Sequence, residues 1–195
     1  MPALGLSGTV GSGKSTVLRI LEDLGAEGIE ADRIGHELLG EPEIVDKVAA
    51  LLGDGVRGKE GELNRSRIRE MVFSDAAVLE EYNNLLHPPL LDRIKEWLDR
   101  PREENRVAVV AAALIPEWGI ESWFDEVWCV VCSDEVALSR WEGPKEHYWQ
   151  IRKAQFAPER KLAKAGRIVE NERSKESLRR STEESYEEYR KARCP

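Results

Sequence analysis

The sequence predicts a three-layer α/β protein with a five-stranded parallel sheet, a helical excursion and a lid. First, a short apolar run, residues 3–7, leads into glycines and then into residues 15–24, whose apolar side chains have helical spacing. Second, another short strand over 26–31 follows, and the order strand, loop, helix, strand is how a parallel α/β sheet begins. Third, two unbroken apolar runs, 107–115 and 127–132, are long enough for strands buried on both faces.

The rest of the chain supplies helices and one more strand. Helical periodicity dominates residues 34–105 and is broken at 53–55, at 58–61 and at Pro88-Pro89. We interpret this region as a helical excursion built onto the sheet. Residues 167–169 are the expected fifth strand. Residues 174–193 are almost wholly charged, and we interpret them as a solvated surface helix with ion pairs between residues four apart.

These elements divide the chain into three parts. Residues 1–35, 105–139 and 165–195 form the core, and residues 36–104 form the helical domain. A polar, aromatic and basic segment, residues 140–164, lies between the last two predicted strands and forms the lid.

Composition and charge exclude several classes of protein. The chain has 195 residues, of which 41% are hydrophobic, and its net charge of −8 argues against a nucleic-acid partner. No run approaches the roughly 20 apolar residues that cross a bilayer, and the N-terminus has no charged leader segment. We therefore expect a cytoplasmic protein without a membrane anchor, either a monomer or a weak homo-oligomer.

The three cysteines do not indicate a disulfide framework. Cys129 and Cys132 have CxxC spacing, but they lie in an apolar run that is expected to be a strand. On a strand, an offset of three points the two side chains to opposite faces. We therefore interpret both as buried structural residues rather than a redox or metal site.

A glycine-rich motif carries the strongest functional signal. Gly8, Gly13, Lys14 and Ser15 fit the pattern G-x-x-x-x-G-K-S/T of the phosphate-binding loop, or P-loop. Glycines there permit positive φ and let successive N–H groups approach phosphate oxygens, while the following helix presents its N-terminal donors to the same anion. Because the motif lies between a predicted strand and a predicted helix, we interpret the chain as a P-loop phosphotransferase that uses ATP and Mg²⁺.

Each part of this loop has an expected role. Lys14 supplies a point charge to the β and γ phosphates, and the Ser15 hydroxyl is the expected Mg²⁺ ligand. The residues expected to contact the nucleotide are Gly8, Val10, Gly11, Ser12, Gly13, Lys14, Ser15 and Thr16.

Carboxylates at the ends of two predicted strands are candidates for further chemistry. Ligands of open α/β sheets bind beyond the carboxyl ends of the strands, and the second strand ends in Glu30-Ala31-Asp32. Asp32 is a candidate to accept the proton of an acceptor hydroxyl, but N-capping of the next helix fits its spacing equally well. Period-two alternation places Glu30 on the same side. Glu117, after the third strand, is a candidate Mg²⁺ ligand or a structural residue.

The chain resembles the dephospho-coenzyme A kinase family over nearly its whole length. The similarity begins in the phosphate loop and continues through Glu30-Ala31-Asp32-Arg33-Ile34 and through Leu63-Asn64-Arg65 with Ile68 and Val72-Phe73. Leu86-His87-Pro88, the stretch Ala113 to Glu117, and Gln155 with residues 165–171 are similar to the family's later motifs.

The resemblance implies transfer of the γ-phosphate of ATP to the ribose 3′-hydroxyl of dephospho-coenzyme A, the last step of coenzyme A biosynthesis. It implies that Asp32 is the base, that Lys14 and Arg140 are catalytic, and that the helical domain binds the pantetheine-bearing substrate. Asn171 would lie on the nucleotide side. The residues on the substrate side would be Glu30, Arg65, His87 and Glu117. For His87, a packed or capping histidine is an open alternative.

Three features depart from the family pattern. Glu30 replaces an aspartate, Gly166 replaces another, and the lid has Arg140 followed by Lys145 where two arginines are usual. A guanidinium bridges two phosphate oxygens and an ammonium does not, so Arg152 or Arg160 would have to supply the second one. The alternatives are a P-loop kinase for another small acceptor and a nucleotide-binding module with weakened catalysis.

Overall fold

The computed structural model describes residues 2–100 and 106–193, which form two compact units. Of the described residues, the first unit combines 2–30 with 106–193, and the second is residues 31–100. The predicted boundary at 104/105 lies outside the described residues. The predicted lid, 140–164, falls within the first unit.

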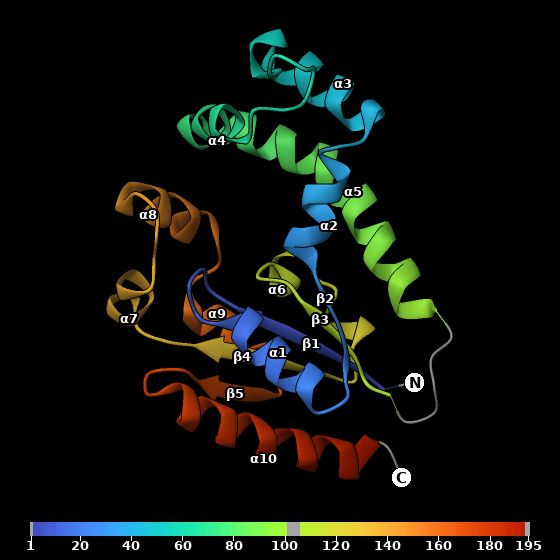
Figure 1. The fold of residues 1–195 in the computed structure, drawn as a ribbon, viewed down its shortest axis with the longest axis vertical. Coiled ribbons are helices and arrows are strands. Elements are labelled where there is room, and N and C mark those ends of the chain that lie inside the picture. The colour runs from blue at the N-terminus through green and yellow to red at the C-terminus, as the bar shows by residue number, and fades with distance from the viewer. Residues whose placement is uncertain (1, 101–105, 194–195) are drawn as a thin grey trace. The chain divides into compact units, whose positions relative to one another are not determined.

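The first unit is built on a five-stranded sheet in which every pair of neighbours is parallel, as the sequence predicts (Figure 1). The strand order is β2-β3-β1-β4-β5, so β1 is central. The strands are β1 (Ala3–Gly8), β2 (Glu27–Glu30), β3 (Ala108–Ala111), β4 (Glu126–Val131) and β5 (Arg167–Glu170).

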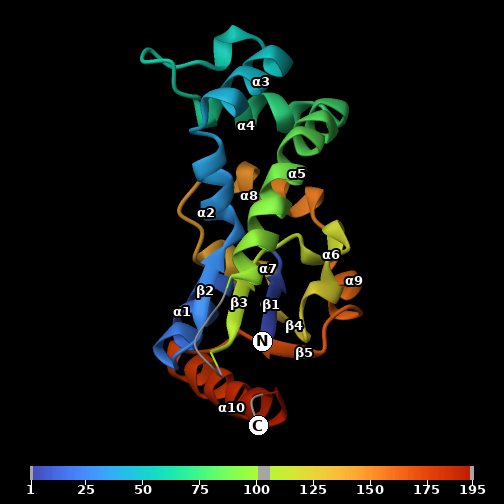
Figure 2. The same cartoon turned by 90° about the vertical axis from the view of Figure 1, so that its right-hand side faces the viewer.

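Helices cover both faces of this sheet, which gives the predicted three layers (Figure 2). Alternation along β1 sets the two faces: Leu4 and Leu6 belong to the core under α1 (Lys14–Asp23) and α10 (Lys175–Arg193). On the opposite face, a Cβ added to Gly5 would touch Ile115 and Phe124. That face carries α6 (Ile115–Trp118), η2 (Glu121–Trp123) and α9 (Pro158–Leu162).

The strand predicted over residues 107–115 is too long. The strand β3 ends at Ala111, and the chain turns into α6, which begins at Ile115 with Pro116 in its first turn. Ile115 and Pro116 are buried, so the apolar run continues because α6 packs on the sheet. Burial explains why these residues are apolar, and the proline is incompatible with a continued central strand because it has no N–H to donate.

The interpretation of the C-terminal segment as a solvated surface helix is incomplete. Arg179 pairs with Glu183 at i,i+4, but one face of α10 is buried. Leu178, Tyr186 and Tyr189 of that face join the main core. The many charged residues of α10 give the segment a low mean hydropathy, but its few apolar and aromatic residues still form a buried stripe on one face.

The second unit is helical. It contains α2 (Ala31–Leu38), α3 (Pro42–Leu52), η1 (Asp54–Val56), α4 (Arg65–Ser74) and α5 (Ala76–Asp99). The predicted interruptions after residue 52 and at 58–61 are confirmed. The interruption predicted at Pro88-Pro89 is wrong, since α5 runs through both prolines. Proline costs hydrogen bonds but keeps a helical φ, and the turn that follows is anchored by buried Leu90 and Ile94.

Two further helices of the first unit, α7 (Asp134–Ser139) and α8 (Lys145–Ala154), follow β4. Among the described residues, no helix is long and apolar enough to cross a membrane.

Candidate active site

The phosphate loop has the expected position, between β1 and α1. Three of its glycines have positive φ: 144° at Gly8, 73° at Gly11 and 97° at Gly13. Gly13 is the N-terminal flanking residue of α1, so the loop ends where that helix presents its unpaired backbone donors. The local geometry therefore supplies an anion-binding concavity at the carboxyl edge of the sheet.

Close packing explains why two of these positions need glycine. A Cβ at Gly8 would lie 2.3 Å from the Val130 carbonyl oxygen, and one at Gly13 would lie 2.1 Å from Asn171 Nδ2. These neighbours hold the loop from β4 and from the residue that follows β5.

Hydroxyl and ammonium groups of the loop fit a bound triphosphate and metal ion. The Ser12 hydroxyl is buried and has no hydrogen-bond partner in the described part of the chain, whereas Ser15 is exposed on the first turn of α1. Lys14 Nζ donates to the carbonyl oxygens of Gly8 at 3.2 Å and Thr9 at 2.9 Å. No group of three acidic, His or Cys side chains suited to a metal occurs within residues 2–100 and 106–193. A serine hydroxyl with phosphates and water suits Mg²⁺ without such a cluster.

Asn171 joins the loop to the start of the lid. Its side-chain Nδ2 donates to the Ser12 carbonyl oxygen at 2.8 Å, and Asn171 is buried. Arg140, exposed at the end of α7, donates from Nη2 to the Asn171 carbonyl oxygen at 3.2 Å. Arg140 is thus connected to the phosphate loop through a single intervening residue, Asn171.

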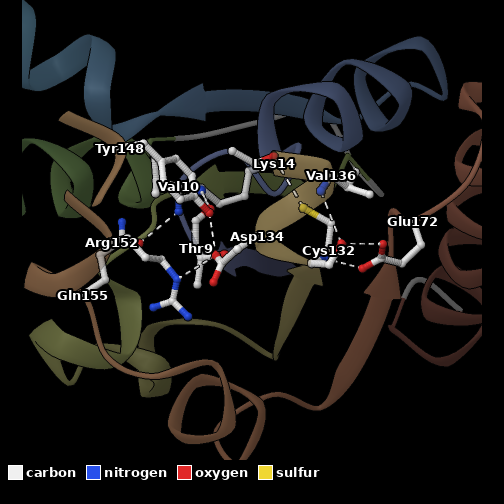
Figure 3. A network of polar contacts seen from close by, with 12 residues as sticks. Thr9, Val10, Lys14, Cys132, Asp134, Val136, Tyr148, Arg152, Gln155 and Glu172 are labelled. Carbon is white, nitrogen blue, oxygen red and sulfur yellow. Dashed lines mark hydrogen bonds and ion pairs between the residues drawn. The ribbon is translucent and has the colours of Figure 1, made fainter. Parts of the chain in front are cut away.

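A residue inside the predicted lid, Gln155, also reaches the loop. The backbone N–H of Val10 donates to Gln155 Oε1 at 2.9 Å (Figure 3). Gln155 follows α8, so both ends of that part of the lid are held to the loop or its neighbours. The sequence resemblance includes Gln155, but no residue pattern predicted this contact.

A second network fixes α8 against the start of α7. Buried Tyr148 donates from its hydroxyl to Asp134 Oδ1 at 2.5 Å, and Arg152 Nε donates to the same oxygen at 3.2 Å (Figure 3). Burial, followed by the hydrogen bond to Asp134, raises the pKa of Tyr148 above its usual value. Asp134 and Tyr148 were not predicted as site residues, because their partners are distant in sequence.

The lid cations differ in what they contact. The guanidinium of Arg160 lies 3.4 Å from the centroid of the Phe156 ring, and Lys145 is exposed at the start of α8. Arg152 lines a cavity of about 160 Å³ next to the phosphate loop. The lining residues are Thr9, Cys129, Val131, Cys132, Ser133, Asp134, Arg152, Pro158 and Lys161.

The prediction that Cys129 and Cys132 point to opposite faces assumed that both lie on one strand, but only Cys129 lies on β4. Both line that cavity, and Cys132 Sγ lies 3.7 Å from the Gly11 carbonyl oxygen. β4 ends at Val131, so the strand alternation no longer applies at Cys132. Both thiols are free, and burial raises the pKa of each.

Glu117 contacts the lid. Its Oε1 atom accepts from Lys161 Nζ at 2.5 Å and from the Phe156 N–H at 2.8 Å. Lys161 Nζ also donates to the Ala113 carbonyl oxygen at 2.6 Å. Burial lowers the pKa of Lys161, and the hydrogen bond and charge of Glu117 oppose that change.

The residues predicted for the acceptor side belong to different parts of the molecule. Glu30 ends β2 in the first unit. Asp32, Arg65 and His87 belong to the second. Asp32 is exposed in the first turn of α2, which begins at Ala31, so the alternative that Asp32 is the N-cap of this helix is wrong.

Arg65 and His87 have different surroundings within the second unit. Arg65 Nη2 donates to the His36 carbonyl oxygen at 3.3 Å, and Arg65 is exposed. His87 is half-buried in α5, and this burial lowers its pKa.

Gly166 lies away from the phosphate loop. It precedes β5, at the amino end of that parallel strand, and its N–H donates to the Val127 carbonyl oxygen at 2.8 Å. A Cβ there would lie 2.8 Å from Glu126 Cγ. The phosphate loop lies at the opposite, carboxyl edge, so this departure concerns strand packing rather than the loop.

A parallel sheet with β1 central and a phosphate loop between β1 and α1 define the molecule as a P-loop kinase fold. A sequence profile described as dephospho-CoA kinase matches residues 3–177. The chain belongs to the dephospho-CoA kinase family.

Individual proteins similar to this chain support its membership of the family. A dephospho-CoA kinase of Idiomarina loihiensis is 32% identical over 95% of this chain and 94% of its own. The dephospho-CoA kinase structure from Campylobacter jejuni has a TM-score of 0.71 and 25% identity, covering 97% of this chain and 98% of its own. A structure from Thermus thermophilus, TT1252, has a TM-score of 0.77 and 25% identity, covering 96% and 97%.

Proposed function

We propose that this protein transfers the γ-phosphate of ATP to the ribose 3′-hydroxyl of dephospho-coenzyme A, the last step of coenzyme A biosynthesis. The observation that carries the proposal is the phosphate loop with Arg140 and Asn171 joined to it, in a chain of the dephospho-CoA kinase family. The net charge of −8 argues against a nucleic acid as the acceptor.

Binding of the triphosphate begins with the loop. Residues Gly8 to Thr16 offer backbone N–H groups to the phosphates, and Lys14 exchanges the carbonyl oxygens of Gly8 and Thr9 for phosphate oxygens. Ser15 would hold Mg²⁺, which neutralises charge on the β and γ phosphates when it is bound. The buried Ser12 hydroxyl supplies a further donor inside the loop.

Proton removal from the acceptor is assigned to Asp32. It is exposed, and it follows β2 by two residues along the chain, beyond the carboxyl end of a strand. A carboxylate there accepts the hydroxyl proton as the oxygen attacks phosphorus. Glu30, at the end of the same strand, contributes a second carboxylate on the acceptor side.

We assign to Arg140 the stabilisation of the negative charge that develops on the transferred phosphoryl group. Its guanidinium already contacts the backbone of Asn171, which holds the loop at Ser12, so it needs little rearrangement. Arg152 lines the cavity beside Thr9, which supports it over Arg160 as a second guanidinium near the phosphates.

We assign acceptor binding to residues 31–100. Exposed Arg65 provides a cation for the diphosphate of dephospho-coenzyme A. Burial lowers the pKa of His87, so it is neutral near pH 7 and provides a hydrogen bond rather than a charge.

The assignment of Asp32 is tested with Mg-ATP and a panel of acceptors. The panel contains dephospho-coenzyme A, nucleoside monophosphates, shikimate and gluconate. The wild-type protein should consume ATP only with dephospho-coenzyme A, and Asp32→Asn should lower kcat by about 10² or more while keeping the Kd for ATP. Glu37→Gln, which removes an exposed carboxylate from the same helix, is the matched control and should keep full turnover.

Two results would count against the proposal. ATP consumption with a different acceptor would overturn the substrate. Saturable ATP binding without transfer to any acceptor would favour a nucleotide-binding module with weakened catalysis. Near-normal turnover of Asp32→Asn would reject the base but not the substrate.

A further inference from the structure

We propose that Glu117 and Lys161 are positioning residues whose buried ion pair fixes the lid root, residues 155–161, and through Gln155 holds the phosphate loop in place. The effect on catalysis rests on the proposed kinase function, but the effect on the loop does not.

The pair is built into the interior of the first unit. The Lys161 side chain is 0% exposed and the Glu117 side chain 13%, with Nζ and Oε1 2.5 Å apart. Glu117 belongs to α6 and Lys161 to α9, which both pack on β1 on the same face of the sheet. The Ala113 carbonyl oxygen takes a second bond from Nζ. The pair therefore joins the lid root to the end of the β3 segment.

A continuous set of contacts leads from this pair to the phosphate loop. Glu117 Oε1 accepts from the Phe156 N–H as well as from Lys161. The preceding residue, Gln155, accepts from the Val10 N–H. Displacing the lid root would therefore pull Gln155 away from Val10.

The charge on each partner matters because the Lys161 side chain is fully buried and that of Glu117 is largely buried. Breaking a buried pair by removing one partner leaves an uncompensated charge, so the remaining group must move or change its protonation. Glu117 Oε2 is buried and has no hydrogen-bond partner within the described residues, which leaves Lys161 and Phe156 to hold this carboxylate. This arrangement assigns Glu117 to the lid root rather than to acceptor or metal binding.

Amide hydrogen exchange of the intact protein without acceptor tests the positional claim. In Lys161→Met, exchange of the Val10 and Phe156 amides should be at least about tenfold faster, while the Leu178 amide in α10 should be unchanged. Lys164→Met is the matched control, since Lys164, three residues beyond the lid root, pairs with Glu121 at a more exposed site. It should exchange like the wild type.

Three further variants extend the test, and the two single ones keep it decisive if Lys161→Met does not fold. Glu117→Gln keeps the shape of the side chain and its contact with Phe156 but removes the charge, and should also accelerate exchange at Val10. Lys161→Arg keeps the cation beside Glu117, so its Val10 amide should exchange more slowly than that of Lys161→Met. The double variant Glu117→Gln/Lys161→Met should exchange no faster than the worse single variant, because the two residues act as a pair.

Kinetics then test the effect on the reaction. Lys161→Met should lower kcat with dephospho-coenzyme A by about tenfold or more while the Kd for ATP stays within about threefold. Unchanged exchange at Val10 in both single variants would overturn the proposal, as would equal acceleration at Leu178. Failure of the wild type to use dephospho-coenzyme A would reject the proposed function but leave the exchange result standing.

Discussion

The Gly13→Ala variant probes the contact on which the loop geometry depends. Gly13 has φ of 97°, and an added Cβ would lie 2.1 Å from Asn171 Nδ2. Left-handed backbone costs a residue with a Cβ about 1–2 kcal/mol. Displacing the Asn171 amide breaks its hydrogen bond to Ser12 and adds about 1–3 kcal/mol for a buried group left unpaired. We expect a loss of about 2–5 kcal/mol in the free energy of unfolding.

The assay is urea unfolding, with Gly25→Ala as the matched control. Gly25 has φ of 93° but no atom within 4 Å of an added Cβ, so its variant should lose only the backbone part, about 1–2 kcal/mol. A cycle with Asn171→Ala isolates the contact. In the double variant the Cβ has room, so the two losses should not add. Additivity within about 0.5 kcal/mol, or equal losses in Gly13→Ala and Gly25→Ala, would refute the reasoning.

Two further predictions concern Arg140 and His87. Arg140→Ala should lower kcat by about 10³ while ATP affinity changes little, and equal losses in both would contradict a role in the transition state. Burial lowers the pKa of His87 from its usual 6.5, so the unfolded chain binds more protons as the pH falls. The free energy of unfolding should therefore be retained above about pH 6.5 and fall below it. In His87→Gln, urea unfolding should show a smaller loss between about pH 7 and pH 5, and an identical loss would reject the assignment.

Local sequence patterns predicted those parts of the fold that depend on neighbouring residues. The phosphate loop follows from Gly8, Gly13 and Lys14, because its conformation and chemistry are encoded within eight residues. All five parallel strands were predicted, three of them from apolar runs, with ends wrong by up to four residues. The end of β3 was missed because Ile115 is buried in a helix rather than in a strand.

Long-range contacts were the part that the sequence did not predict. Lys161 lies in the basic segment predicted to be the lid, yet its side chain is buried against Glu117, 44 residues away in the sequence. Asp134 holds Tyr148 and Arg152, and no spacing rule connects them. Pro88 and Pro89 indicated an interruption, but packing on either side carries α5 through them. In each case tertiary burial decides what the local pattern leaves open.

The central claim, phosphoryl transfer to the ribose 3′-hydroxyl, is tested most directly by identifying the product. Purified protein is incubated with Mg-ATP and dephospho-coenzyme A, and phosphorus and proton NMR locate the new phosphate. The account predicts a monoester on the 3′-oxygen and stoichiometric ADP. A phosphate at another position, or ADP formed without any phosphorylated acceptor, would contradict it.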